Sequence, residues 1–148
     1  IVGRGGRTLQ DRWRAGMRAY KGTAVPGFPN LFLLVGPNTG LGHSSQVFMI
    51  ESQIAYVLDA VRRLQRTGGV VEVAEDAETA WDTAVQRAMG RTVWTTGGCA
   101  SWYLDARGRN TTLWPGSTWR FRRLTARFDP SAYQAVESLS APELAGTA

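Results

Sequence analysis

The feature that most constrains this chain is a short apolar run that is followed by a glycine-rich turn and a long amphipathic segment. The run Leu31–Val35 is continuous and flanked by turn residues, which is typical of a strand buried on both faces. Residues 36–45 follow as a tight loop, and residues 45–65 carry apolar side chains at helical spacing. The sequence therefore predicts a strand, a glycine-rich loop and a helix in this order.

The amphipathic segment has clear boundary signals and a defined apolar stripe. Either Ser44 or Ser45 is a natural N-cap, and the pair Gly68–Gly69 is a natural stop. The stripe consists of Val47, Ile50, Ile54, Val57, Leu58, Val61 and Leu64. We therefore expect one long helix with one apolar side.

Weaker signals predict the remaining elements. Thr8 is expected to cap a helix that reaches about residue 20, and Asp76 to cap another with a regular apolar period. Val70–Val73 is predicted as a second short strand, and a last helix is expected over residues 118–127. The predicted fold class is α/β, mostly helical with a few short strands.

Length and composition set the broad class of protein. The chain has 148 residues, of which 43% are hydrophobic and 20% charged, and this favours one globular domain. We expect one unit over residues 1–130 and a loosely ordered tail over residues 131–148, where periodicity is weak. No apolar run is long enough to predict a membrane span. The single cysteine, Cys99, excludes an internal disulfide and a cysteine-clustered zinc site, and it fits a cytoplasmic location.

Positive charge is concentrated in two parts of the chain. The net charge is +5, and arginines cluster within residues 1–23 and 101–128. Basic patches can bind nucleic acids, anionic cofactors or acidic domains. The basic stretch Trp119–Arg123 lacks an RNA-recognition motif and has too few aromatic residues for a base-stacking sheet. We expect no nucleic-acid partner and interpret this stretch as a solvated helix face or a domain contact.

The residues that could carry chemistry each have a structural interpretation as well. His43, the only histidine, precedes the long helix, and hydrogen bonding or packing is favoured there over proton transfer. Cys99 has no histidine beside it to form a nucleophilic pair. Trp102 is either a core residue or a platform that stacks on a flat ligand. The glycine-rich turn either brings its backbone close to a ligand or is purely structural, because its dinucleotide fingerprint is incomplete.

The turn belongs to an ordered series of short motifs. The series comprises residues 27–32 (GFPNLF), 36–39 (GPNT), 42–45 (GHSS) and 50–53 (IESQ). It is extended by residues 3–6 (GRGG), 20–23 (YKGT), 101–103 (SWY) and 108–116 (GRNTTLWPG). In this order the motifs resemble the C-terminal part of class B flavoprotein monooxygenases, which include the Baeyer–Villiger and flavin-containing monooxygenases. The resemblance spans about residues 1–130, and the Baeyer–Villiger branch fits best.

The resemblance implies the C-terminal portion of a flavoenzyme with two Rossmann-like dinucleotide-binding domains, in which residues 1–130 belong to the FAD-binding domain. In such enzymes NADPH reduces FAD, and the reduced flavin activates O₂ to oxygenate a small organic ketone, amine or sulfide. The family's turn and helix in this region close over the flavin, and a tryptophan at the position of Trp102 lies near the nicotinamide nucleotide. The implied cofactor-binding residues are Gly36, Pro37, Asn38, Gly42, His43, Ser44, Gln46 and Trp102.

The main cofactor fingerprints of the family do not occur in these 148 residues. The resemblance therefore implies that FAD and NADPH are held mainly by N-terminal parts, and that no catalytic residue or metal ligand lies in this chain. The implied partner is the upstream half of the same enzyme, without which the chain is expected to be inactive and to aggregate through an exposed apolar edge. The alternative is a non-catalytic interaction module, or remnant, that binds a partner protein.

Overall fold

The computed structural model describes residues 1–42, 44–96 and 101–136, and within them the chain is mostly helical with one two-stranded sheet. The elements are the 3₁₀ turns η1 (Arg4–Gly6) and η2 (Pro130–Ala132), the helices α1 (Leu9–Arg12), α2 (Gln46–Thr67), α3 (Glu75–Met89), α4 (Val93–Thr96) and α5 (Thr118–Leu124), and the strands β1 (Val70–Val73) and β2 (Tyr133–Val136). The predicted fold class, α/β with mostly helical content, is confirmed.

The long predicted helix is α2, but its apolar stripe does not face the core. Gly68, with φ 71°, ends the helix as predicted, and its N–H donates to the carbonyl of Leu64. The buried side chains of α2 are Met49, Ser52, Gln53, Tyr56 and Ala60. Those most exposed in the predicted stripe are Val47, Ile54, Leu58 and Val61, which we call the outer stripe. The structure thus buries the side of the helix opposite to its most aliphatic one.

The start of α3 and the short sheet join the two long helices. Ala74, rather than the predicted Asp76, is the N-cap of α3, and the acidic side chains in its first turn complement the positive end of the helix. The predicted strand Val70–Val73 is confirmed as β1, and it pairs antiparallel with β2 from Val70↔Val136 to Val73↔Tyr133. The expected loose tail is therefore wrong for residues 131–136, which form η2 and β2; residues 137–148 lie outside the described part.

The predicted strand over Leu31–Val35 is wrong. Asn30 and Val35 have positive φ values of 53° and 57°, so the extended backbone is interrupted at both ends. The N–H of Leu33 donates to Thr23 and that of Val35 to the side chain of Gln53, so no second strand pairs with this segment. Its apolar residues are divided among two core clusters and solvent, which accounts for the misleading pattern.

The two shorter predicted helices form but end early. Thr8 caps α1 by accepting a hydrogen bond from the N–H of Asp11, as expected, but the helix stops at Arg12. Gly16, with φ 121°, adopts a conformation that a right-handed helix excludes. In α5, the side chain of Ser117 caps the start, and the helix ends at Leu124 instead of residue 127.

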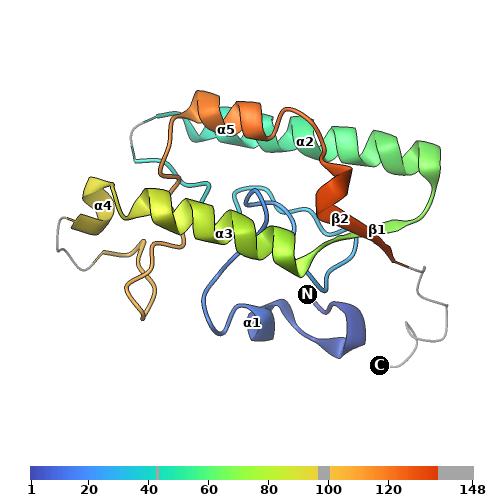
Figure 1. The fold of residues 1–148 in the computed structure, drawn as a ribbon, viewed down its shortest axis with the longest axis horizontal. Coiled ribbons are helices and arrows are strands. Elements are labelled where there is room, and N and C mark those ends of the chain that lie inside the picture. Colours follow the sequence, from blue (N-terminus) through green and yellow to red (C-terminus); the bar gives the residue numbers. More distant parts are fainter. Residues whose placement is uncertain (43, 97–100, 137–148) are drawn as a thin grey trace.

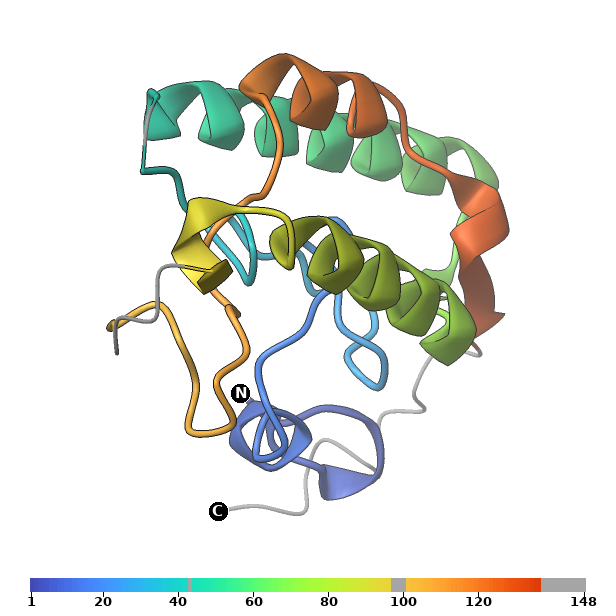
Figure 2. The same cartoon turned by 60° about the vertical axis from the view of Figure 1, so that its left-hand side comes forward.

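Buried apolar residues of the described part form several clusters, and the one that joins the helices lies where α2, α3 and α5 meet. Figures 1 and 2 show α2 and α5 side by side, with α3 beneath them and irregular N-terminal segments between the layers. Met49, Val85, Trp114 and Phe121 form one cluster that connects these three helices. The indole rings of Trp81 and Trp114 stack at 5.9 Å between ring centres, with 12° between their planes. This core holds the start of α2 and the segment before it in a fixed relation.

Candidate functional site

The glycine-rich turn before α2 is joined by backbone hydrogen bonds to a distant segment of the chain. The N–H of Asn38 donates to the carbonyl of Thr111 at 2.9 Å, and that of Gly40 to Thr112 at 2.8 Å. The N–H of Trp114 donates back to the carbonyl of Gly40 at 2.8 Å. The turn is therefore held to residues 110–114 as if by a short strand pairing, although neither segment forms a regular strand.

Asn38 strengthens this pairing with its side chain. Its Nδ2 donates to the carbonyls of Asn110 at 2.8 Å and Leu113 at 3.0 Å, and the residue is 6% exposed. Its φ of 57° lies in the left-handed region, which asparagine tolerates better than most residues. The structure therefore shows Asn38, predicted as a cofactor contact, using both amide hydrogens to bind neighbouring backbone.

The glycines of the turn are needed for close packing within the chain. A Cβ at Gly36 would collide with the carbonyl of Gly22, and a Cβ at Gly42 would lie 2.6 Å from the indole of Trp94. At Gly40 a Cβ would lie 2.9 Å from the carbonyl oxygen of Thr112. These positions exclude larger residues for structural reasons, whether or not a ligand is also close.

The N-terminus of α2 carries no local negative partner. Ser45 occupies the N-cap position but makes no side-chain cap hydrogen bond, and the first turn has no acidic residue. Ser44, Ser45 and Val47 are exposed. The side chain of Gln46 reaches back and donates to the carbonyl of Thr39 at 3.1 Å. The first-turn N–H groups, which concentrate about half a positive charge at a helix start, therefore have neither a cap from Ser45 nor an acidic side chain in the same turn.

A chain of aromatic rings connects this helix start with Trp102. Trp94 in α4 contacts Gly42 and lies edge to face with Tyr103, at 5.9 Å between ring centres. Tyr103 packs in the same way against Trp102, also at 5.9 Å, and Trp102 itself is 81% exposed. Trp102 is therefore a surface indole, not a core residue, and it is linked through two rings to the turn. The role of Trp94 was not expected from the sequence.

Gln53 fixes the segment that leads into the turn, and sequence reasoning missed it. Its side chain is fully buried, and its Nε2 donates to the carbonyl of Gly22 at 2.9 Å and to Thr23 Oγ1 at 3.0 Å. Its Oε1 accepts from the N–H of Val35 at 2.9 Å. A glutamine between apolar residues of a long helix is the only sequence signal that could have indicated this clamp.

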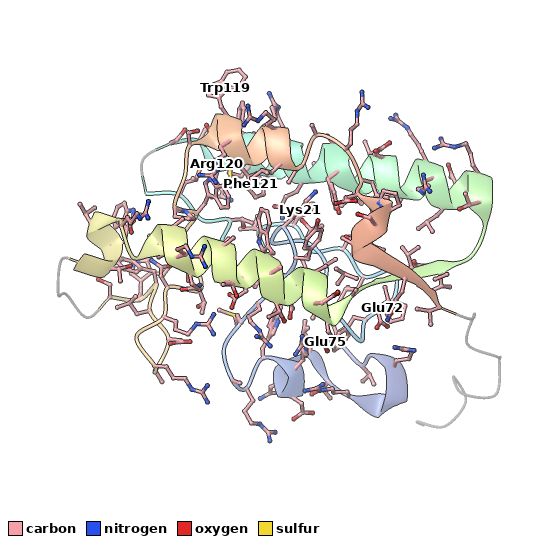
Figure 3. All side chains as sticks on the ribbon, viewed as in Figure 1. Lys21, Glu72, Glu75, Trp119, Arg120 and Phe121 are labelled. Atoms are coloured by element: carbon pink, nitrogen blue, oxygen red, sulfur yellow. The ribbon has the colours of Figure 1, made fainter. Side chains whose placement is uncertain are left out.

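A buried lysine lies beneath α2. Figure 3 shows Lys21 in the interior between α2 and α3, and its Nζ lies 4.8 Å from the ring centre of Tyr56 and 5.3 Å from that of Tyr20. Burial lowers the pKa of Lys21, and the nearby Asp129 opposes this effect. Burial also raises the pKa of Tyr20 to about 12, with Asp129 contributing. Lys21 directly precedes Gly22, whose backbone packs against Gly36 of the turn, so the contacts of Lys21 with the two rings join the N-terminal segment to α2 close to the turn.

Most of the predicted site residues belong to the turn and are together for that reason. Pro37 and Asn38 are buried, Ser44 is exposed and Gln46 is half-buried, while His43 lies outside the described residues. Whether any of them contacts a cofactor stays a prediction. Glu51 of α2 is exposed and pairs with Arg122 of α5 at 3.3 Å. In Figure 3 Trp119 of α5 points away from the body, in line with a solvated helix face.

Comparisons with known proteins give a consistent relationship. A Baeyer–Villiger monooxygenase of Pseudomonas aeruginosa is 57% identical over 135 residues, which are 90% of this chain and 26% of that protein. Another, of Streptomyces coelicolor, is 51% identical over 138 residues, or 92% of this chain and 27% of its own length. The chain is a homologue of part of the Baeyer–Villiger monooxygenases. No protein-family model matches the chain.

Two further matches, one to a solved structure and one to a fungal protein, agree with this relationship. The structure of a steroid monooxygenase bound to NADP superimposes with a TM-score of 0.76 and 28% identity, covering 93% of this chain and 26% of that one. An FAD-binding monooxygenase of Aspergillus niger is 35% identical over 130 residues, which are 83% of this chain and 21% of that protein. The chain thus spans about a quarter of the length of the curated relatives named above.

Two general features of the described residues complete the site description. No helix among them is both long and apolar enough to cross a membrane. Across the same ranges, no group of three or more His, Cys, Asp or Glu side chains could hold a metal ion. The cytoplasmic location stays a prediction.

Proposed function

We propose that this chain is the part of an FAD- and NADPH-dependent monooxygenase that closes over the flavin. The observation that carries the proposal is the 57% identity over 135 residues with a Baeyer–Villiger monooxygenase. The Aspergillus niger relative is named as FAD-binding, and the steroid monooxygenase is bound to NADP, which supports these two cofactors. The complete enzyme would add one oxygen atom from O₂ to a ketone, or to an amine or sulfide.

The start of α2 fits the electron-rich edge of a flavin. Its N–H groups lack a side-chain cap, its first turn has no carboxylate, and Ser44 and Ser45 are exposed. An uncapped helix start of this kind stabilises negative charge on a neighbouring group. When bound, FAD supplies the redox and oxygen chemistry, and the residues from Gly36 to Gln46 would orient its ring. Trp102, an exposed indole linked to this turn through Tyr103 and Trp94, would stack against the nicotinamide nucleotide.

The glycines give no independent support for a ligand, because contacts within the chain already explain them. Gly36 and Gly42 are fixed by Gly22 and Trp94 respectively. Asn38 is likewise engaged with Asn110 and Leu113. We therefore propose that Gly36, Pro37 and Asn38 shape the turn, whereas the backbone from Gly42 to Gln46 approaches the cofactor. The cofactor's remaining contacts would come from the upstream half of the enzyme.

The test is a full-length chimera in which this chain replaces the matched 135 residues of the Pseudomonas aeruginosa relative. We expect the purified chimera to retain flavin absorbance and to oxidise NADPH. Ser45→Asp places a carboxylate at the helix start, where it caps the N–H groups and repels negative charge on the ring. The flavin potential should become more negative and FAD should dissociate more readily.

The matched control is Ala55→Glu, which adds the same charge at an exposed position ten residues further along α2. It should leave the flavin potential and FAD retention unchanged. Equal effects of the two variants would contradict a flavin at the helix start. A folded chimera that takes up no flavin would instead favour the alternative function, a non-catalytic interaction module.

A further inference from the structure

The outer stripe of α2 is an aliphatic surface without a partner among the described residues. Val47, Ile54, Leu58 and Val61 are 61%, 40%, 46% and 37% exposed, and their spacing of seven, four and three residues places them on one side of the helix. Three further aliphatic residues, Ile50, Val57 and Leu64, are half-buried along its margin. Scattered exposed apolar residues are ordinary, but a continuous line over four turns marks an interaction surface.

The neighbouring elements of the chain leave this surface open. The helix α5 packs on a different side of α2, where Trp119 contacts Phe48 and Arg122 pairs with Glu51. Leu34 and Val35 before the turn are also exposed, but the N–H of Val35 donates to Gln53 on the opposite, buried side of α2, so these two residues are not part of the stripe. The outer stripe therefore runs from the start of α2 along about four turns of the helix.

We propose that the outer stripe docks on the remainder of the monooxygenase polypeptide, the part that aligns with the other three quarters of the relatives' length. This inference rests on the proposed function. The chain covers 26% of the Pseudomonas aeruginosa relative, so a large protein body is available to cover the stripe. The two-stranded sheet is also too small to organise an α/β core by itself.

Tethering favours this occupant over a second copy of the chain. Separate chains usually need roughly 1,000 Å² of buried surface for a specific interface, and one line of aliphatic side chains offers less. A segment of the same polypeptide avoids most of the entropic cost of association. The stripe begins at Val47, directly after Gln46, so the surface that covers it would also fix the position of the turn. Docking of α2 and placement of the helix start at the flavin are thus one event.

The test measures thiol accessibility at two positions of α2. Leu58→Cys lies in the outer stripe, and Arg63→Cys, five residues further, is exposed on the opposite side of the same helix; both are made with Cys99→Ser. Each variant is labelled with a maleimide in the isolated chain and in the full-length chimera, and peptide mass spectrometry locates the label. In the chimera we expect labelling at position 58 to slow at least tenfold, and labelling at position 63 to change less than twofold.

Equal labelling rates at position 58 in the two proteins would overturn the proposal. Protection at position 58 in the isolated chain that increases with its concentration would assign the stripe to a second copy and overturn it as well. Met49→Cys, at a fully buried position, reports whether the chimera folds. If it is labelled, the same pair of positions is measured in a complex of this chain with the co-expressed upstream part, where failure of the two parts to co-purify counts against docking. A chimera protected at position 58 but lacking flavin would retain the docking surface and refute the proposed function.

Discussion

The buried side of α2 is more polar than its exposed side, which is the reverse of the usual arrangement in a globular protein. The inner side contains Ser52, Gln53 and Tyr56, all buried, whereas the outer stripe is aliphatic and exposed. The inner side is positioned by hydrogen bonds to irregular segments, which need polar groups to satisfy their backbone. The outer stripe has the composition of a core surface. The difference shows that α2 packs on one side within this chain and is open on the other, where we propose that the rest of the polypeptide docks.

The largest expected effect is on the inner side. Gln53→Leu leaves the N–H of Val35 and the carbonyl of Gly22 without their side-chain partner. The free energy of unfolding should fall by ~3 kcal/mol or more, because each buried group left unpaired costs roughly 1–3 kcal/mol. Urea unfolding measures it, with Gln65→Leu as the exposed control on the same helix. Similar losses in both variants would remove the distinction between the two sides.

The second effect concerns the hydrogen bonds that join the turn to residues 110–114. Asn38→Asp keeps a residue that accepts a positive φ but removes both amide donors to Asn110 and Leu113. We expect a loss of ~2 kcal/mol. The control is Asn30→Asp, whose side chain accepts from the N–H of Val71 and therefore keeps its hydrogen bond. An unchanged unfolding midpoint for the first variant would mean that the side chain contributes nothing to the turn.

The third effect is on the outer stripe and is small for the isolated fold. Leu58→Glu should change the unfolding free energy of the isolated chain by only ~0.5 kcal/mol, because the side chain has no packed partner to lose. Urea unfolding of the isolated chain measures this change, with Ala55→Glu as the control for the added charge at another exposed position of α2. A destabilisation of several kcal/mol by Leu58→Glu would place the stripe inside the fold of this chain.

The smallest effect comes from the titration of Tyr20, which changes the stability only at alkaline pH. The pKa of Tyr20 is raised from 10.0 to about 12, so the unfolded chain loses this proton first and stability falls as pH rises between these values. Lys21 acts oppositely below its ordinary pKa of 10.5, because its folded pKa is lowered and stability rises towards that value. Thermal unfolding from pH 10.5 to 11.5 should therefore show a decline that is shallower in Tyr20→Phe. A slope equal to that of the unsubstituted chain would exclude Tyr20 as its source.

Periodicity predicted the long elements well because it depends only on neighbouring residues. The bounds of α2, the existence of α3 and the strand β1 all followed from local patterns and from Gly68 as a stop signal. The orientation of α2 could not be predicted, since an apolar stripe shows that one side is buried somewhere but not by which part of the protein. The same reasoning explains why Leu31–Val35 was mistaken for a buried strand.

Contacts between distant residues were the main losses. The strand β2 owes its existence to pairing with β1, more than sixty residues earlier, and its own sequence has little periodicity. The side-chain hydrogen bonds of Gln53 and of Asn38 also join residues that are distant in the chain. For the candidate site, the motifs located the turn, but only the geometry separated residues that shape it, such as Asn38, from an exposed group such as Trp102.

The hydrogen bonds between the turn and residues 110–114 also limit how far the side chain of Trp102 can move. The three backbone and two side-chain hydrogen bonds between residues 38–40 and 110–114 anchor one end of the loop that carries this indole. The N–H of Thr111 adds a tie to the carbonyl of Tyr103, directly beside it. The loop that carries Trp102 is therefore anchored to the turn a few residues away from the indole. If Trp102 acts as proposed, we expect its movement toward a nucleotide to be a small pivot about Tyr103, because a larger movement would break the hydrogen bonds that hold the turn.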